Sequence, residues 1–127
     1  MEIRASISVG ELVDKITILE IKLEKINNSK KLEDVNNELN ILNEYFIEIE
    51  NTDLTKLKSK LKETNLKLWK IEDDIRICEK NQNFGDDFIS LARAVYTTND
   101  ERFRFKNLIN EIFSSEVKEV KSYEDYE

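Results

Sequence analysis

Residues 54–78 read LTKLKSKLKETNLKLWKIEDDIRIC, and apolar side chains recur in this stretch at alternating intervals of four and three positions. This heptad spacing is typical of a helix that buries one narrow stripe against partner helices. Neither glycine nor proline interrupts it, so we predict one helix over about 54–81, roughly 40 Å long. The stripe has one polar member and comprises Leu57, Leu61, Thr64, Leu68, Ile71, Ile75 and Cys78.

Two stretches nearer the N-terminus show the same spacing. The first predicts a helix over about 9–26, and Ser8 with Glu11 forms the capping box typical of a helix start. The second predicts a helix over about 31–50, and short polar runs that contain asparagine separate the three helices. The stripes are Leu12, Ile16, Leu19, Leu23 and Ile26 in the first, and Leu32, Val35, Leu39, Leu42, Phe46 and Ile49 in the second.

The sequence after the longest helix predicts two shorter helices. One begins near Gly85, and the other begins at Thr98 or Asn99, where Thr98 and Glu101 form a further capping box. We therefore predict an all-α fold. Three long helices form an antiparallel bundle or coiled-coil core, and the two shorter helices form a C-terminal cap.

A chain of 127 residues has the length of one domain, here residues 1–127. The ends, 1–7 and 114–127, are predicted to be extended or flexible. Apolar and polar residues alternate within the first seven positions, which is a weak strand pattern. The alternative is therefore a short β pairing of the two termini.

Charge is segregated along the chain. Residues 32–50 contain six acids and no base, whereas residues 54–70 contain six lysines and one acid. Because these blocks lie on consecutive helices, an antiparallel hairpin would place them opposite each other. We predict that they set the register of that hairpin.

Composition excludes several classes of function. The chain has no histidine and one cysteine, so it has no imidazole base, no disulfide within the chain and no His- or Cys-based metal site. A net charge of −7 argues against a dedicated nucleic-acid binder. No signal peptide or membrane span is expected. We predict a cytoplasmic protein with no catalytic residues, no cofactor and no contact with nucleic acid or membranes.

A polar run at the predicted junction of the last two helices offers one candidate site. A helix N-terminus at this point would present free N–H groups to an anion. The candidate ligands for a phosphate or carboxylate are Arg93, Asn99, Arg102 and Lys106. The alternative is a capped helix turn with surface ion pairs, such as Asp100 with Arg104.

Apolar residues outside the stripes suggest an interface. A three-helix core buries one stripe per helix, so some of these side chains stay exposed in a monomer. The candidates are Ile18, Ile21, Ile41 and Tyr45. We predict a homo-oligomer, or a complex with another protein, unless the C-terminal helices cover the first helix. The leading hypothesis is a non-catalytic interaction module that self-associates. The alternative is a small-molecule anion binder, or an enzyme, at the predicted junction.

Four segments together resemble a known family. They are SVGELVDKITILEIK (8–22), LWKIEDDIRICEKNQNFG (68–85), LARAVYTTNDERFRFK (91–106) and KSYEDY (121–126). The family consists of small microbial and viral proteins and is known only as a domain of unknown function. The resemblance implies a protein of this size, and it implies no activity and no site residues.

Overall fold

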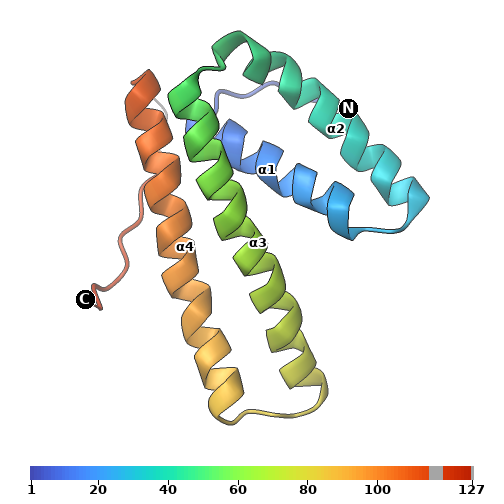
Figure 1. Cartoon of the computed structure of the whole chain (residues 1–127), viewed down its shortest axis with the longest axis vertical. Coiled ribbons are helices and arrows are strands. Elements are labelled where there is room, and N and C mark those ends of the chain that lie inside the picture. The colour runs from blue at the N-terminus through green and yellow to red at the C-terminus, as the bar shows by residue number, and fades with distance from the viewer. Residues whose placement is uncertain (115–118, 127) are drawn as a thin grey trace.

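The computed structural model describes residues 1–114 and 119–126, and it contains four helices within them. They are α1 (Val9–Lys25), α2 (Ser29–Ile49), α3 (Thr52–Lys80) and α4 (Asp86–Phe113). They form two hairpins, and the α1–α2 hairpin crosses one half of the longer α3–α4 hairpin (Figure 1). The other half of the long hairpin projects beyond the crossing. The predicted all-α bundle is confirmed, but its number of helices is not.

Polar side chains that flank the first three helices accept hydrogen bonds from the free amides at the helix starts. Ser8 accepts from the amide of Glu11, Asn28 from that of Lys31, and Asn51 from that of Leu54. The asparagine-containing runs therefore end one helix and cap the next. This local chemistry explains why the boundaries of α1, α2 and α3 lie close to their predicted positions.

The predicted break at Thr98 is wrong, because α4 is one continuous helix through this residue. Thr98 is buried inside the helix, so its hydroxyl caps nothing. Glu101, the other half of the capping box, turns toward α3 instead. Its Oε1 lies 3.3 Å from the hydroxyl of Thr64 and 3.6 Å from Nζ of Lys67. Packing against α3 therefore outweighs the modest helix propensity of this polar run.

The predicted β pairing of the termini is also wrong for the part of the chain that the structure describes, which has no strand. Residues 1–7 are exposed and non-helical, and the two ends of the chain lie on opposite sides of the molecule in Figure 1. Within the predicted extended end 114–127, Ser114 caps α4 and residues 119–126 run beside α4. Residues 115–118 and 127 lie outside the described residues.

The two charge blocks do not face each other, so the predicted hairpin pairing is wrong. The backbone of α2 packs only against α1 among the described helices, whereas α1 also packs against α3 and α4. Two lysines of α3, Lys58 and Lys62, pair with α1 instead. Lys58 lies 3.2 Å from Glu20, and Lys62 lies 2.8 Å from Glu24.

The main hydrophobic core lies at the crossing of the two hairpins. Its buried members come from all four helices but only from residues 12–61 and from Ile109. No helix in the described part of the chain is both long and apolar enough to cross a membrane. The core residues are Leu12, Val13, Ile16, Leu19, Val35, Leu39, Phe46, Leu54, Leu61 and Ile109.

The projecting half of the long hairpin, residues 69–97, is called the arm below. All of its residues are described, and Cys78 is the only one that is buried. Phe84 and Phe88 meet edge to face at its tip, with ring centroids 5.4 Å apart. The arm is therefore a two-helix unit whose apolar residues are only partly covered.

Candidate functional site

A buried ion cluster joins α1, α3 and α4. Asp14 of α1 is 2 % exposed, and two helices supply donors to its carboxylate. Arg102 of α4 donates through Nε to Oδ1 at 2.9 Å and through Nη2 to Oδ2 at 2.5 Å. Asn65 of α3 donates through Nδ2 to Oδ1 at 2.9 Å and also to the hydroxyl of Thr17. A bidentate arginine in this geometry fixes both distance and orientation between helices.

Lys106 extends the cluster toward the surface. Its Nζ lies 2.8 Å from Glu11, 2.9 Å from Glu119 and 3.9 Å from Asp14, and the residue is 6 % exposed. Glu119 belongs to the C-terminal segment, which we define as residues 119–126. The cluster therefore ties this segment, as well as α1, to α4.

The start of α1 approaches α4 closely because residue 10 has no side chain. The amide of Gly10 donates to Oδ1 of Asn110 at 2.7 Å, and both residues are buried. A Cβ at position 10 would lie 2.4 Å from the backbone oxygen of Lys106. Only glycine allows this close approach.

The electrostatics of the cluster keep both cations charged. The hydrogen bond to Asp14 raises the pKa of Arg102 above its ordinary value. Burial acts to lower the pKa of Lys106, but the hydrogen bonds to Glu11 and Glu119 outweigh it, so this pKa is raised as well. A lysine that stays protonated at neutral pH is neither a general base nor an amine nucleophile. The geometry therefore supports a structural role for the cluster.

The structure separates the four predicted anion ligands. Arg102 and Lys106 share a face of α4, as predicted, but carboxylates of the same chain already pair with them. Asn99 lies beside Arg102. Arg93 lies on the opposite face of α4, where it is exposed and lines a hollow with Asp86 and Ile89. No helix N-terminus exists at this point, because α4 is continuous. These contacts do not favour a small-anion site, which stays an untested prediction.

The predicted interface residues also divide into two groups. Ile18 and Ile21 line a pocket of about 490 Å³ between α1, α3 and α4, together with Trp69 and Arg102. Ile21 is 1 % exposed, because α3 and α4 cover this face of α1. Ile41 and Tyr45 on α2 are 48 % and 53 % exposed.

The sequence interpretation missed the central residue of the cluster. Asp14 was not singled out, although a signal was present. It lies in α1 between the core residues Val13 and Ile16, where a carboxylate must find a partner if it is to be buried. That signal predicts some buried cation but does not identify Arg102, which is 88 positions away. Among the described residues, no group of three or more acidic or cysteine side chains is placed to hold a metal ion.

Comparison with known proteins identifies the family but assigns no activity. A family model described as a family of unknown function (DUF6165) matches residues 3–126. The chain belongs to this family. The resemblance expected from the four segments is thereby confirmed, and it extends over nearly the whole chain. No curated protein and no solved structure matches the chain. A function for this DUF6165 member therefore has to be argued from its own geometry.

The contact between Glu119 and Lys106 predicts a pH response of the C-terminal segment. Burial acts to raise the pKa of Glu119, but Lys106 outweighs it, and the pKa lies below the ordinary 4.5. The ion pair with Lys106 therefore stabilises the folded position of the segment fully above pH 4.5. This stabilisation is lost as the pH falls through the lowered pKa of Glu119. We expect the amide NMR signals of Glu119 and Val120, which lie next to this carboxylate, to shift in that acidic range. In Glu119→Gln this transition should be absent, and an unchanged transition would contradict the contact.

Proposed function

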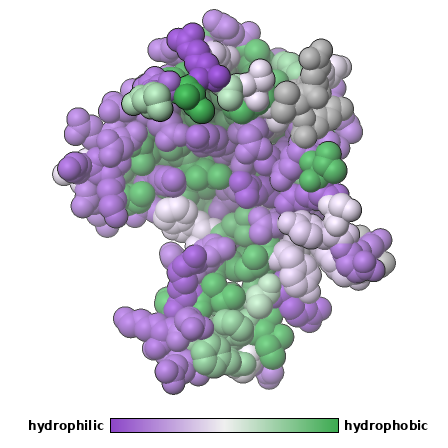
Figure 2. Space-filling model, turned by 180° about the vertical axis from the view of Figure 1, so that it is seen from behind, coloured by the Kyte–Doolittle hydropathy of each residue, from purple (hydrophilic) through white to green (hydrophobic). Residues whose placement is uncertain are grey.

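We propose that this protein is a non-catalytic interaction module that self-associates by pairing its arm with the arm of a second copy. The observation that carries the proposal is the apolar surface of the arm. Ile77, Phe84 and Ile89 are 53–54 % exposed, although the main core contains no residue from the arm. Figure 2 shows hydrophobic residues gathered on one face of this projecting half. Exposed apolar patches of this kind are typical of protein interfaces.

The outer face of α4 within the arm is complementary to itself. Asp86, Ile89, Ser90 and Arg93 line one hollow on this face. Consider a two-fold axis that crosses α4 between Ile89 and Ser90. Asp86 lies as far before this point as Arg93 lies after it. Antiparallel pairing of two copies therefore places each Asp86 opposite the Arg93 of the other copy, which is the isologous pattern of a two-fold dimer.

Small and apolar residues lie between these charges. Ser90 separates two shallow hollows, one lined by Ile89 and Ala94 and the other by Ile77 of α3. Small side chains allow helices to approach closely, and the isoleucines supply the area to be buried. The anion that Arg93 binds in this arrangement is a carboxylate of the second copy.

The first test measures the oligomeric state by sedimentation equilibrium. We expect a mass near twice 15.0 kDa that falls with dilution. Ile89→Glu removes one apolar side chain from each copy, and burying each of them contributes about 1.5–3 kcal/mol to association. The dissociation constant of the dimer should therefore rise about 100-fold or more. Ile41→Glu on α2 is the matched control, because Ile41 has a similar exposure of 48 %, and it should leave the dimer intact.

A charge exchange tests the register itself. Asp86→Arg or Arg93→Asp alone creates two like-charge contacts and should weaken the dimer. The double variant restores opposite charges across the axis and should recover most of the affinity. A mass near 15.0 kDa at every concentration would refute self-association. A dimer that Ile41→Glu dissociates and Ile89→Glu does not would move the interface to α2.

A further inference from the structure

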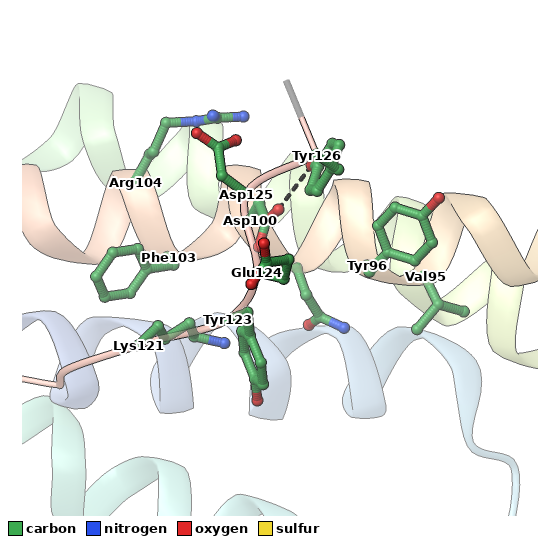
Figure 3. Close-up of a pocket in the computed structure, with 11 residues that line it drawn as sticks. Val95, Tyr96, Asp100, Phe103, Arg104, Lys121, Tyr123, Glu124, Asp125 and Tyr126 are labelled. Carbon is green, nitrogen blue, oxygen red and sulfur yellow. Dashed lines mark hydrogen bonds between the residues drawn. The ribbon is translucent and has the colours of Figure 1, made fainter.

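A second candidate site lies between α4 and the C-terminal segment, and its lining shares no residue with the two hollows at the proposed dimer axis. It is a pocket of about 810 Å³ (Figure 3). Tyr96 and Phe103 line it from α4, and Tyr123 and Tyr126 line it from the segment. This volume lies within the range of about 300–1,000 Å³ that is usual for small-molecule sites.

The segment is held in position over α4 by specific contacts. The hydroxyl of Tyr126 donates to Oδ2 of Asp100 at 2.6 Å, drawn as the dashed line in Figure 3. The rings of Tyr126 and Tyr96 meet edge to face, with centroids 5.2 Å apart. At the other end of the segment, Glu119 pairs with Lys106. The pocket is therefore a defined feature of the folded chain, built from two of its parts.

One cation of the protein already contacts the aromatic rings of this pocket. The ammonium of Lys121 lies 5.9 Å from the ring centroid of Phe103 and 5.6 Å from that of Tyr123. Both distances are within the range of about 6 Å at which a ring face attracts a cation. The two rings are thus arranged so that one ammonium can contact both of them.

The charged groups around the rings favour a cation over an anion. Three carboxylates line the pocket, from Asp100, Glu124 and Asp125, against two cations, from Arg104 and Lys121. A bound anion would meet a net negative charge. A neutral apolar molecule would use the rings but not the carboxylates. A molecule with a positively charged nitrogen and short apolar groups uses both.

We propose that this pocket binds a small organic ammonium ion, with Phe103 and Tyr123 forming an aromatic cage for the charged nitrogen. Asp100 and Glu124 supply the surrounding negative potential. Lys121 occupies the cage in the free protein, and the ligand displaces its ammonium. Because the lysine stem is long and flexible, the displaced ammonium moves into solvent.

The test is calorimetric or NMR titration of the full-length protein with choline and, in a separate experiment, with spermidine. We expect saturable binding in at least one of the two titrations, and a comparison of them distinguishes a quaternary ammonium from a polyamine. Tyr123→Leu keeps the apolar bulk but removes the ring, and it should weaken binding about tenfold. Tyr123 is 80 % exposed, so this variant should fold normally. Tyr45→Leu on α2, at 53 % exposure, is the matched control.

Lys121→Met removes the internal competitor and should tighten binding several-fold. A simple surface-charge effect would also strengthen cation binding, so the uncharged isostere of choline, 3,3-dimethylbutan-1-ol, is titrated in parallel. Equal binding of this alcohol would overturn the proposal, and so would the absence of any ammonium binding to Lys121→Met. Binding that Tyr123→Leu leaves unchanged would contradict the cage.

Discussion

Asp14→Asn is expected to lower the free energy of unfolding by about 3 kcal/mol, the low end of the range for a buried ion pair that loses one partner. Asparagine keeps the shape of the side chain but removes its charge. Arg102 and Lys106, whose side chains are 29 % and 7 % exposed, then lose the carboxylate that lies between them. Chemical denaturation followed by circular dichroism measures the loss.

A matched control distinguishes the buried ion pair from ion pairs in general. Asp74 also pairs with a cation, Lys70, at 3.0 Å, but the side chains of this pair are 36 % and 78 % exposed. Asp74→Asn should therefore change stability by less than about 1 kcal/mol. Equal effects of the two substitutions would show that Asp14 is not the centre of a buried cluster.

Replacing both partners separates the net contribution of the pair from the cost of leaving one charge alone. Asp14→Leu with Arg102→Met removes both charges while keeping apolar volume. Buried ion pairs exchanged in this way are often neutral in stability. The double variant should therefore be more stable than Arg102→Met alone, which leaves Asp14 without its bidentate partner. A double variant that is less stable would contradict this explanation.

Local chemistry made part of this fold predictable. The heptad spacing of Leu57, Leu61 and Leu68 requires a helix with one buried stripe, whatever that stripe contacts. Asparagines at positions 28 and 51 can cap the helix that follows them, so the boundaries of α2 and α3 depend on neighbouring residues only. These features need no knowledge of the rest of the chain.

Features that depend on the partner helix were not predictable in this way. The run around Thr98 contains a correct capping box, yet the side chain of Glu101 contacts Thr64 of α3 and α4 continues through Thr98. The lysines at 58 and 62 have the right charge to pair with α2, but the backbone of α3 packs against α1 and not against α2, and α1 supplies Glu20 and Glu24. Periodicity identifies which face of a helix is buried, but not which helix buries it.

The same limit applies to the buried cluster and to the aromatic pocket. The sequence predicts that Arg102 binds an anion, and in the structure that anion is the carboxylate of Asp14 in the same chain. Tyr123 and Phe103 are 20 positions apart in the sequence, and they become neighbours only because the C-terminal segment returns along α4. No spacing rule connects these residues before the fold is known.

Gly10→Ala is expected to destabilise the protein by about 2–3 kcal/mol, in the range for inserting atoms into a packed interior. In most helices the same change is stabilising, because alanine exceeds glycine in helix propensity by about 1 kcal/mol. Here the new Cβ would lie 2.4 Å from the backbone oxygen of Lys106 and 2.9 Å from Oδ1 of Asn110. A backbone oxygen within a helix cannot rotate away, so α1 must move off α4.

That movement should weaken every contact that the start of α1 makes with α4. The hydrogen bond from Gly10 to Asn110 and the ion pair between Glu11 and Lys106 both depend on the close approach. We therefore expect the melting temperature to fall and the amide of Gly10 to lose its protection from hydrogen exchange. Asn110→Ala should not rescue Gly10→Ala, because the closer clash is with the backbone.

Gly85 is the matched control for this prediction. It is the only other glycine in the sequence, and a Cβ there would meet nothing nearer than Oδ1 of Asn83, at 3.6 Å. Its φ of −83° is accessible to any residue, but Gly85 is the N-cap of α4, where alanine is somewhat less favourable than glycine. Gly85→Ala should therefore change the free energy of unfolding by no more than about 1 kcal/mol. The two substitutions add the same methyl group, so a clearly larger loss of stability at position 10 would isolate the contact between α1 and α4. A Gly10→Ala protein as stable as Gly85→Ala would mean that α1 does not lie this close to α4.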